Sequence, residues 1–466
     1  MTDVAPAEAP AADRSFFGHP KGLAFILGAE CGYAFAYYGM QTMLTLYMTQ
    51  TLLKPGHVEH VWGFAPYRAV LQQIYGPLTP LGLASQTFGL SQSLLYALPL
   101  LGGLLADRWL GQRRTVLFGF LTLTAAFLLL VGEPTFLLAL ALMIVGVGLL
   151  KTSFVGQLGR LYSRDDDRRT RAFGLYLIAV NIGSMTQPLI AGTVGERVGW
   201  IYGLMVLAAG MAGATLSYTL GLRHMPRDIV QTRRKGALKA PPLEARDLRI
   251  VGILLVLILL NGVNLGIYNQ AWNVFPVWAT ANVERHIGGF LAPETWFGTL
   301  DGIFTIVGTA LAVRWWTLQD RGPVKPSEIR RITVGFVLAG SAYAILAFGA
   351  WLGRPAPGGL GMTPMAAAVA FFLFADFAIP WTDTVTMAVI TREAPPSINT
   401  TMIGVYYLFY GAGNFLTGWL GGQADRMTMP AFWLMHAAIL GVCVLVLVLF
   451  GGAMRRGLRP PEPVAA

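Results

Sequence analysis

Long apolar runs dominate this chain and restrict what it can fold into. About twelve of them reach the roughly 20 residues that a helix, rising about 1.5 Å per residue, needs to cross the hydrocarbon core of a bilayer. Because 55% of the 466 residues are hydrophobic and only 12% are charged, a water-soluble domain could not bury them all. The sequence therefore predicts an all-α membrane protein. The predicted spans centre near residues 36, 96, 122, 147, 183, 210, 264, 305, 340, 377, 411 and 441.

The basic residues predict the orientation of these spans. The formal net charge of +10 alone would be compatible with nucleic-acid binding. Of the 34 Lys and Arg, however, about 27 fall on the side of the two termini, about six on the other side and one, Lys151, inside a span. Basic residues gather on the cytoplasmic side of membrane proteins. We therefore expect cytoplasmic termini, a lipid bilayer as the surroundings and no nucleic-acid partner.

The chain has a 6+6 organisation, with six spans, a polar and basic linker, and six more spans. Two packed bundles around a central cavity are the simplest arrangement of such a sequence. A weak internal repeat supports it, because GGLLADRWLGQRR (102–114) and LQDRGPVKPSEIRR (318–331) occupy equivalent places in the two halves. The predicted parts are a disordered tail 1–20, a bundle 21–222, a linker 223–248, a bundle 249–454 and a tail 455–466.

Histidines and cysteines give no sign of a metal or a disulfide. Cys31 and Cys443 both fall in predicted spans, so no disulfide framework is implied. His57 and His60 form an H-x-x-H pattern in a predicted outer loop, but no further ligand is close in sequence. We expect neither a metal site nor a cofactor. His436 is the only histidine inside a span, and paired catalytic groups are missing, so an intramembrane enzyme is not expected.

A carboxylate, Glu30, lies in the first span with no basic residue beside it. Glu30, Tyr33, Tyr37 and Gln41 recur at i, i+3, i+7 and i+11, which places them on one helix face, near Tyr38. An ionisable group at mid-membrane costs roughly 2.5 to 3.5 kcal/mol. We therefore expect this face to line a cavity. In the alternative, the tyrosines simply pack and Glu30 hydrogen-bonds a neighbouring helix.

The fourth span carries one charge, Lys151. It lies nine residues before Arg160, the start of a basic cluster, and is therefore roughly 13 Å deep at about 1.5 Å per residue. We predict that Lys151 pairs with Glu30 when the site is empty. In the alternative, the lysine side chain reaches back to the membrane surface.

The second half carries three aspartates within apolar runs, Asp301, Asp376 and Asp383. Asp376 and Asp383 share one face of a regular helix, but Pro380 between them is expected to kink it and shift the register. Either aspartate could bind a cationic group, or could satisfy backbone freed by the kink. A stripe of Asn261, Asn264 and Tyr268 at i, i+3 and i+7 adds neutral polar groups to the predicted cavity.

Several segments resemble a known family of transporters. GGLLADRWLGQRR is similar to the cytoplasmic loop signature of the major facilitator superfamily. Further segments resemble the proton-coupled oligopeptide transporter family within it, in order and over nearly the whole chain: FFGHPKGLAFILGAE, FAYYGM, YALPLLGGLLADRWLGQRRTV, VNIGSMTQPLIAGTVGERVGW, WWTLQDRGPVKPS, TREAPPSINTTMIGVYYL and GAGNFLTGWLGG. The residues of the loop signature are Gly103, Asp107, Arg108, Gly111, Arg113 and Arg114.

This resemblance implies a major facilitator fold of twelve transmembrane helices in two six-helix bundles. It also implies proton-driven symport of di- and tripeptides into the cell by alternating access, by a monomer in the bacterial inner (plasma) membrane. The alternative is the same fold with a different cargo, such as a drug, an amino acid, nitrate or a modified peptide.

The chain departs from the family pattern at the first helix. In the motif E-x-x-E-R-F-x-Y-Y-G, Glu30 is the first glutamate, whereas Tyr33 replaces the second acid and Ala34 the arginine. A further arginine is replaced by Gln41, and Asn269 stands where an acid commonly precedes the glutamine of helix 7. The peptide carboxylate has thus lost one expected anchor, which keeps the alternative cargo open.

The resemblance also implies roles for individual residues. Proton coupling falls to Glu30 first and to Asp301 second, where the family has asparagine. Lys151 is implied to bind the peptide carboxylate. Because Ile379 replaces the family glutamate that meets the peptide amine, Asp376 or Asp383 is expected to take over that contact. The remaining implied substrate-binding residues are Tyr37, Tyr38, Tyr96, Asn181, Asn269, Gln270 and Tyr406.

Overall fold

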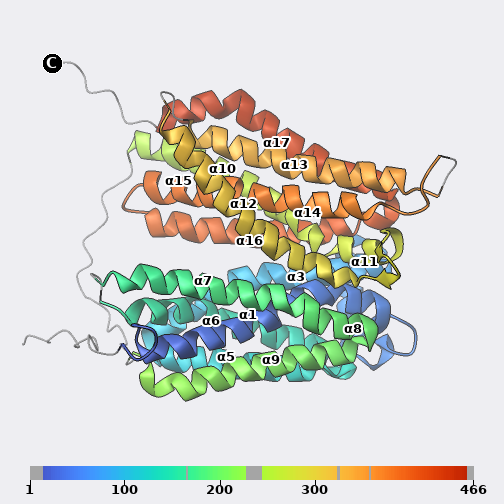
Figure 1. Ribbon diagram of the computed structural model, residues 1–466, viewed down its shortest axis with the longest axis horizontal. Coiled ribbons are helices and arrows are strands. Elements are labelled where there is room, and N and C mark those ends of the chain that lie inside the picture. Colours follow the sequence, from blue (N-terminus) through green and yellow to red (C-terminus); the bar gives the residue numbers. More distant parts are fainter. Residues whose placement is uncertain (1–13, 164–165, 227–243, 323–325, 356–357, 459–466) are drawn as a thin grey trace, which may run out of the picture. The chain divides into compact units, whose positions relative to one another are not determined.

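The computed structural model describes residues 14–163, 166–226, 244–322, 326–355 and 358–458. Most of these residues lie in helices, and two short antiparallel strands, β1 (His286–Ile287) and β2 (Phe290–Leu291), form a hairpin (Figure 1). Much of the predicted tails 1–20 and 455–466 and of the linker 223–248 falls outside these ranges. Those three predictions therefore stay predictions.

The chain folds into two compact units. The first comprises Met1–Gly76 and Leu94–Gly236, and the second Pro77–Ser93 and Ala237–Ala466. The helices of the first unit are α1 (Lys21–Tyr47), α2 (Phe64–Tyr75), α4 (Pro99–Leu105), α5 (Gln112–Leu130), α6 (Phe136–Arg160), α7 (Arg168–Gln187), α8 (Thr193–Arg197) and α9 (Trp200–Gly221). Those of the second are most of α3 (Pro80–Ala97), α10 (Ala245–Tyr268), α11 (Val274–Asn282), α12 (Phe297–Asp320), α13 (Glu328–Leu352), α14 (Met365–Ile379), α15 (Val385–Glu393), α16 (Asn399–Gly421) and α17 (Met429–Leu458).

The division differs from the predicted bundles 21–222 and 249–454 at the start of α3. Here α3 packs against α16. The Ser93 hydroxyl donates a hydrogen bond to the carbonyl oxygen of Gly411. A Cβ on Gly89 would lie 2.6 Å from the backbone nitrogen of Gly418. Contacts of this kind cannot be read from an apolar run, which is why the sequence assigned all of this helix to the first bundle.

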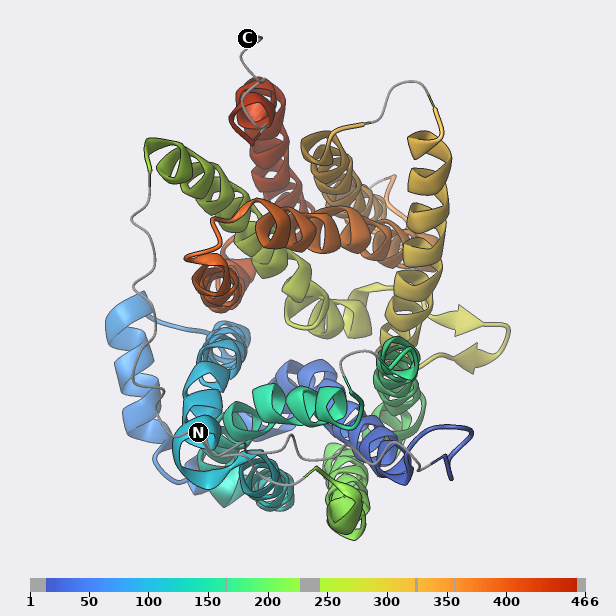
Figure 2. The same ribbon diagram turned by 90° about the vertical axis from the view of Figure 1, so that its left-hand side faces the viewer.

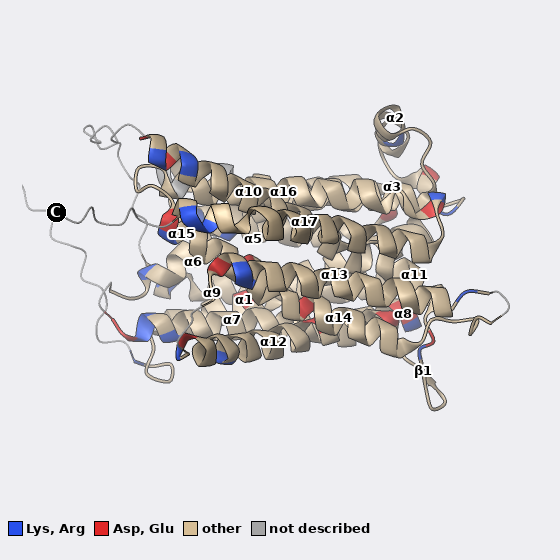
Figure 3. Cartoon of the chain, turned by 90° about the horizontal axis from the view of Figure 1, so that it is seen from above, with Lys and Arg blue, Asp and Glu red and all other residues tan. Residues whose placement is uncertain are grey.

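Nine helices in the described part of the chain are long and apolar enough to cross a membrane. The three remaining predicted spans coincide with α1, the α3–α4 pair and α16. These helices are less uniformly apolar, and α3 illustrates why: it buries Ser85, Gln86, Thr87, Ser91 and Gln92. Figure 3 shows the charged residues mostly near the ends of the long helices, with largely uncharged surface between them. This arrangement is the one that a bilayer requires.

Within each unit the helices pack lengthwise. In the first unit α1 packs against α7 and α9, and α5 packs against α6 (Figure 2). In the second unit α14 packs against α12 and α13, and α10 packs against α16.

A glycine seam, formed by Gly262, Gly266 and Gly413, joins α10 to α16. A Cβ on Gly413 would lie 2.2 Å from the carbonyl oxygen of Gly262, and one on Gly266 would lie 2.4 Å from that of Gly413. Both distances are shorter than any contact that a real Cβ makes. Only glycine allows the two backbones to come this close, as at other membrane helix crossings.

Pro380 begins a π-helical turn, Pro380–Thr384, between α14 and α15. Proline lacks the N–H that would bond one turn back, so a regular helix cannot continue through it. The Thr382 hydroxyl bonds to the carbonyl oxygen of Ala378 at 3.1 Å and partly satisfies the loosened backbone. The predicted shift of register at Pro380 thus takes the form of a widened turn just before Asp383.

Candidate functional site

Glu30 lies in the interior of the first unit. Its side chain on α1 is 4% exposed. The Tyr176 hydroxyl on α7 is its side-chain hydrogen-bonding partner, and Lys151 on α6 interacts with it electrostatically. Oε2 of Glu30 is buried without a hydrogen-bond partner. A buried carboxylate therefore has one hydroxyl and one distant cation to compensate it.

Lys151 is half-buried and lies over an aromatic ring. Its Nζ is 4.6 Å from the ring centroid of Tyr96, which is cation–π distance. Although both residues are described, Glu30 and Lys151 do not form an ion pair within 4.0 Å. The sequence predicted that Lys151 pairs with Glu30, and the structure shows an electrostatic interaction without an ion pair, so the pairing stays a prediction. The lysine is thus held partly by the tyrosine ring and keeps its donors for another anion.

The tyrosines that follow Glu30 pack against one another. The rings of Tyr33 and Tyr37 stack at 5.6 Å, and those of Tyr37 and Tyr38 meet edge to face at 5.2 Å. Tyr37 is 7% exposed and Tyr38 is 37% exposed, so Tyr38 has the more accessible side chain. Asn181 on α7 donates to the carbonyl oxygen of Leu177 in its own helix at 2.8 Å.

Asp383 is the centre of a polar cluster in the second unit. One of its oxygens, Oδ1, accepts from Nδ2 of Asn261 at 3.2 Å and from the hydroxyls of Tyr406 and Tyr410. Asn261 Nδ2 also lies 3.2 Å from the Tyr406 hydroxyl. Three donors on one oxygen are what an ionised carboxylate attracts. Helices α10 and α16 supply these donors.

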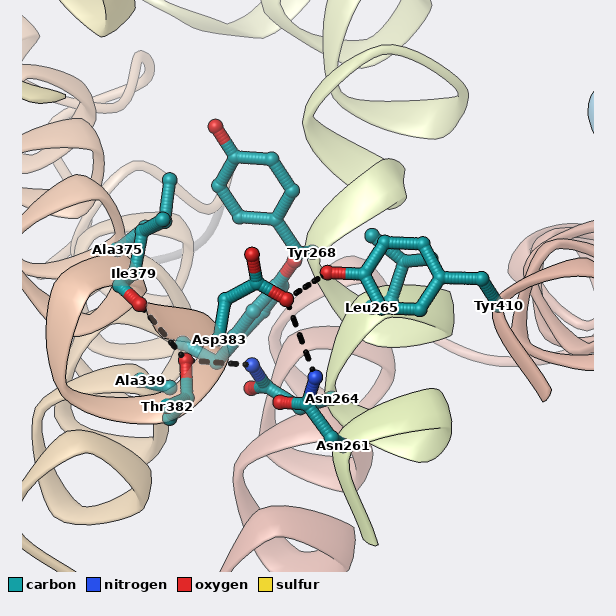
Figure 4. A pocket seen from close by; sticks show the side chains of 11 residues that line it. Asn261, Asn264, Leu265, Tyr268, Ala339, Ala375, Ile379, Thr382, Asp383 and Tyr410 are labelled. Carbon is teal, nitrogen blue, oxygen red and sulfur yellow. Dashed lines mark hydrogen bonds between the residues drawn. The ribbon is translucent and has the colours of Figure 1, made fainter. Parts of the chain in front are cut away.

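A cavity of about 90 Å³ adjoins this cluster (Figure 4). Asn261, Asn264 and Tyr268 of α10 line it together with Asp383 and Tyr410. The predicted stripe on α10 therefore lies on the cavity. A wider hollow of about 470 Å³ also reaches Asp383 and Tyr410, and includes Tyr406 and Tyr407. Asp383 is thus accessible from two spaces and is placed to meet a cationic group.

Two further acids of the second unit, Asp301 on α12 and Asp376 on α14, meet at Tyr268. The Tyr268 hydroxyl contacts Oδ1 of Asp301 and lies 3.0 Å from Oδ1 of Asp376. Asp376 is 0% exposed and is not part of the cavity lining. The two aspartates that the sequence placed on one helix face therefore have different surroundings.

Asn269 and Gln270 lie in a short turn after α10 and are buried against α16. Asn269 donates to Oδ1 of Asn414 at 2.6 Å, and Gln270 donates to the carbonyl oxygen of Thr417 at 2.9 Å. Neither lines the cavity next to Asp383. In this structure their amides hold the end of α10 to α16.

The loop signature forms the turn between α4 and α5. Gly111 has φ +77°, a conformation that favours glycine, and begins α5. A Cβ on Gly103 would lie 3.2 Å from the Thr152 hydroxyl of α6, so the helices are close here. Arg113 donates to the carbonyl oxygen of Leu222 at 2.5 Å, and Arg114 is exposed. The side chains of Asp107 and Arg108 lie outside the described part of the structure.

Sequence reasoning missed two hydroxyls of these clusters, Tyr176 and Tyr410. Tyr410 follows Tyr406 by four residues, so the two share one face of α16, and this spacing could have indicated it. Tyr176 gave no such signal, because it stands alone among apolar residues of α7. In the outer loop, His57 bonds to Glu133 at 2.7 Å, and the described residues include no group of three or more metal-ligating side chains.

The family model that matches residues 31–418 is that of the Major Facilitator Superfamily. The chain belongs to the major facilitator superfamily. Its fold is accordingly the twelve-helix all-α membrane fold that the sequence predicted, and this facilitator is a multi-pass membrane protein.

Several known transporters are similar to this facilitator along nearly their whole length. It is 24% identical to a peptide transporter of Yersinia enterocolitica subsp. palearctica, over 95% of this chain and 96% of that protein. It is 26% identical to a di-/tripeptide transporter of Lactococcus lactis subsp. cremoris, over 85% and 88% of the two chains. A crystal structure of a peptide transporter in complex with sulfate aligns with a TM-score of 0.81 at 20% identity, over 96% and 98%.

Proposed function

We propose that this facilitator is a proton-coupled symporter that imports di- and tripeptides by alternating access. The full-length similarity to bacterial peptide transporters supports the cargo. The charged groups support it independently. A zwitterionic peptide has one cationic and one anionic end, and the chain holds an accessible carboxylate, Asp383, in one unit and a half-buried lysine, Lys151, in the other.

The observation that carries this proposal is the cavity beside Asp383. Its walls combine the Asp383 carboxylate with amides of Asn261 and Asn264 and hydroxyls of Tyr268 and Tyr410. Such a lining suits an ammonium group, because the carboxylate supplies the opposite charge and the amides and hydroxyls accept or donate further hydrogen bonds. We assign the peptide amine to Asp383.

The proton enters the mechanism at Glu30. Protonation of Glu30 removes the negative charge that Lys151 faces, so the lysine is released to bind the peptide carboxylate. The bound peptide then neutralises Lys151 and Asp383, and the units change conformation more easily because an unpaired buried charge resists closure. Loss of the proton and the peptide on the inner side restores the interaction of Glu30 with Lys151.

The orientation follows from the basic residues. We propose that both termini are cytoplasmic, that the protein works in the inner membrane of a bacterium and that it works as a monomer. The excess of Lys and Arg on the side of the termini supports this orientation.

Uptake of labelled dialanine into proteoliposomes tests the proposal. With an inward proton gradient, the wild-type protein should accumulate dialanine, and without the gradient it should only exchange internal for external peptide. Glu30→Gln should lose accumulation by at least about tenfold, worth about 1.4 kcal/mol, and keep exchange. Glu284→Gln is the matched control, since Glu284 is exposed beside the β1–β2 hairpin. If Glu30→Gln accumulates dialanine normally, Glu30 is not the proton carrier.

A different cargo is the second candidate. It is favoured by Ala34 and Gln41, which replace two arginines of the first-helix pattern and leave Lys151 as the half-buried cation beside Glu30. Competition of labelled dialanine by a panel of amino acids, drugs, nitrate and modified peptides separates the two candidates. If dialanine is not transported and another solute drives proton flux, the protein is a transporter of the same fold with a cargo other than a peptide.

A further inference from the structure

The second unit contains a pair of buried acids to which the proposed function gives no joint role. Asp301 on α12 and Asp376 on α14 both contact the hydroxyl of Tyr268 on α10. The two carboxyl groups are also close enough to act on each other electrostatically. Three helices thus bring two acids and one hydroxyl to a single point.

The geometry of Tyr268 is best satisfied by a proton on one of these acids. A hydroxyl has a single hydrogen and can donate only once. Its oxygen nevertheless contacts Oδ1 of Asp301 and, at 3.0 Å, Oδ1 of Asp376. With the hydrogen directed to Asp301, the second contact is a full hydrogen bond only when Asp376 is itself protonated and donates to the hydroxyl.

No cation in the described surroundings compensates the charge of these two carboxyl groups in place of a proton. The titratable groups that act on the two carboxyls come from α10, α12, α13 and α14, and they are Tyr268, the two aspartates themselves and Tyr343. His436 on α17 stacks on Tyr343, and its Nδ1 donates to the carbonyl oxygen of Phe432 at 2.7 Å. Across the described residues, no lysine or arginine forms an ion pair with either aspartate. Two ionised carboxylates in contact at such a site repel strongly, and one shared proton removes the repulsion.

An unpartnered oxygen points to the same conclusion. Oδ2 of Asp376 is buried and has no hydrogen-bond partner, although the side chain is 0% exposed. An ionised carboxylate with a bare buried oxygen carries a large desolvation cost, whereas a protonated carboxyl does not. Asp383, seven residues later, shows the opposite pattern, with three donors on one oxygen.

We propose that Asp301 and Asp376 share one proton and form the proton-coupling site of the second unit. Tyr268 acts as a positioning residue that links this site to the cavity, since it lines the cavity and contacts both acids. With one proton the pair carries a charge of −1. A second proton from outside forms one further O–H bond and makes the pair neutral, and its release inside restores the single shared proton. This inference rests on the proposed function. It separates proton coupling from binding of the peptide amine, because the amine is left to Asp383 alone.

Infrared spectroscopy of the purified protein without substrate tests the shared proton. At neutral pH, the wild-type spectrum should contain a protonated-carboxyl band that is missing from the double variant Asp301→Asn/Asp376→Asn. Asp383→Asn, the matched control in the turn that follows α14, should keep the band. Identical spectra for wild type and double variant would overturn the proposal. Since no substrate is used, this result stands whether or not the protein carries peptides.

Transport by the single variants tests the coupling. Asp301→Asn and Asp376→Asn should each lose gradient-driven accumulation of dialanine by at least about tenfold while keeping exchange, which also shows that the variants are folded. If Asp376→Asn instead keeps coupling and raises the KM of exchange about tenfold, Asp376 binds the amine and the proposal fails. If the wild-type protein neither accumulates nor exchanges dialanine, the proposed function fails, and the infrared result alone decides the shared proton.

The role of Tyr268 has its own readout. Tyr268→Phe should move the pH midpoint of the infrared carboxyl band by about one pH unit, corresponding to about a tenfold change in proton affinity. A purely structural role would lower the yield or stability of the protein and leave this midpoint unchanged. An unchanged midpoint would therefore overturn the assignment of Tyr268 as the positioning residue.

Discussion

Glu30 in the first unit has a lysine within electrostatic reach, whereas Asp301, Asp376 and Asp383 of the second unit form no ion pair in the described chain. The second unit uses uncharged groups instead. Asp383 is surrounded by an amide and two hydroxyls, and Asp301 and Asp376 meet at one hydroxyl. Both units thus hold carboxyl groups among packed helices, but only Glu30 has a cation acting on it, whereas Asp301, Asp376 and Asp383 are met by uncharged donors.

The difference teaches how each site can respond to a proton. When a carboxylate that compensates a cation is protonated, the positive charge of the cation is left uncompensated. The proton therefore directly creates a binding site for an anion. A carboxyl pair that already shares a proton changes only its own charge. An ionised carboxylate held by three donors responds mainly to a cationic ligand. The three arrangements therefore predict different results when one partner is removed.

Removal of Lys151 should have the largest effect. Lys151→Met leaves the buried Glu30 carboxylate without the cation that acts on it, and an uncompensated buried charge is unfavourable. We expect dialanine accumulation to fall by more than about a hundredfold and the thermal unfolding midpoint of the purified protein to drop. Adding Glu30→Gln to Lys151→Met should restore the midpoint but not the transport. If the double variant is as unstable as Lys151→Met, the two charges do not compensate each other.

Loss of the Asp383 charge should come next. Charge-assisted hydrogen bonds are worth about 1.5 to 3 kcal/mol, so Asp383→Asn should raise the KM for dialanine exchange by roughly 10- to 150-fold. Proton binding by the Asp301–Asp376 pair should be unaffected. A normal KM in this variant would remove Asp383 as the amine site and return that role to Asp376.

Removal of one donor from Asp383 should have a smaller effect. Tyr410→Phe deletes one of the two hydroxyls on Oδ1 and should raise the KM for exchange by about fivefold, which corresponds to about 1 kcal/mol. Tyr407→Phe is the control, because Tyr407 lines the wider hollow and its hydroxyl is not among the donors to Asp383. Equal effects of the two changes would mean that the loss reflects packing and not the hydrogen bond.

The smallest effect is expected outside the membrane-spanning helices, for the pH dependence of stability at a contact between a histidine and a tyrosine. His19 bonds to the Tyr162 hydroxyl at 2.8 Å, and burial, with Arg168 and Arg171 nearby, lowers the pKa of His19 below its usual 6.5. The unfolded chain then binds the proton more readily, so stability is present above about pH 6.5 and decreases as the pH falls through the lowered pKa.

The change in the free energy of unfolding should stay below about 1 kcal/mol. Melting of the purified protein at about pH 7.5 and about pH 5.5 measures it. His19→Gln should reduce the difference between the two midpoints, whereas His60→Gln, at an exposed position, should not. A wild-type protein that is more stable at the lower pH would contradict the sign.

The fold was largely predictable, because span length and apolarity are local properties of the sequence. The stripe of Asn261, Asn264 and Tyr268 was also predictable, since the period of a helix decides which residues share a face. The separate surroundings of Asp376 and Asp383 were not. They depend on the widened turn at Pro380 and on hydroxyls from other helices, and neither is encoded in the spacing of the two aspartates.

Asn269 and Gln270 show a second limit. Their family positions suggested contact with the cargo, but α10 ends at Tyr268 and the following turn directs both amides to α16. The end of a helix inside a membrane unit is set by packing partners and not by a local stop signal. That Glu30 and Lys151 influence each other was easier to predict, because few other charges occur at that depth, but their predicted pairing stays a prediction.

The glycine seam between α10 and α16 has a consequence for any conformational change. Asn261 lies on one side of the seam, and Tyr406 and Tyr410 lie on the other, so the donors to Asp383 sit on two backbones in direct contact. We therefore expect α10 and α16 to move together as a rigid pair. The hydrogen bonds to Asp383 would then break when α14 and the turn Pro380–Thr384 move relative to this pair. A single methyl group at Gly413, as in Gly413→Ala, would push α10 and α16 apart.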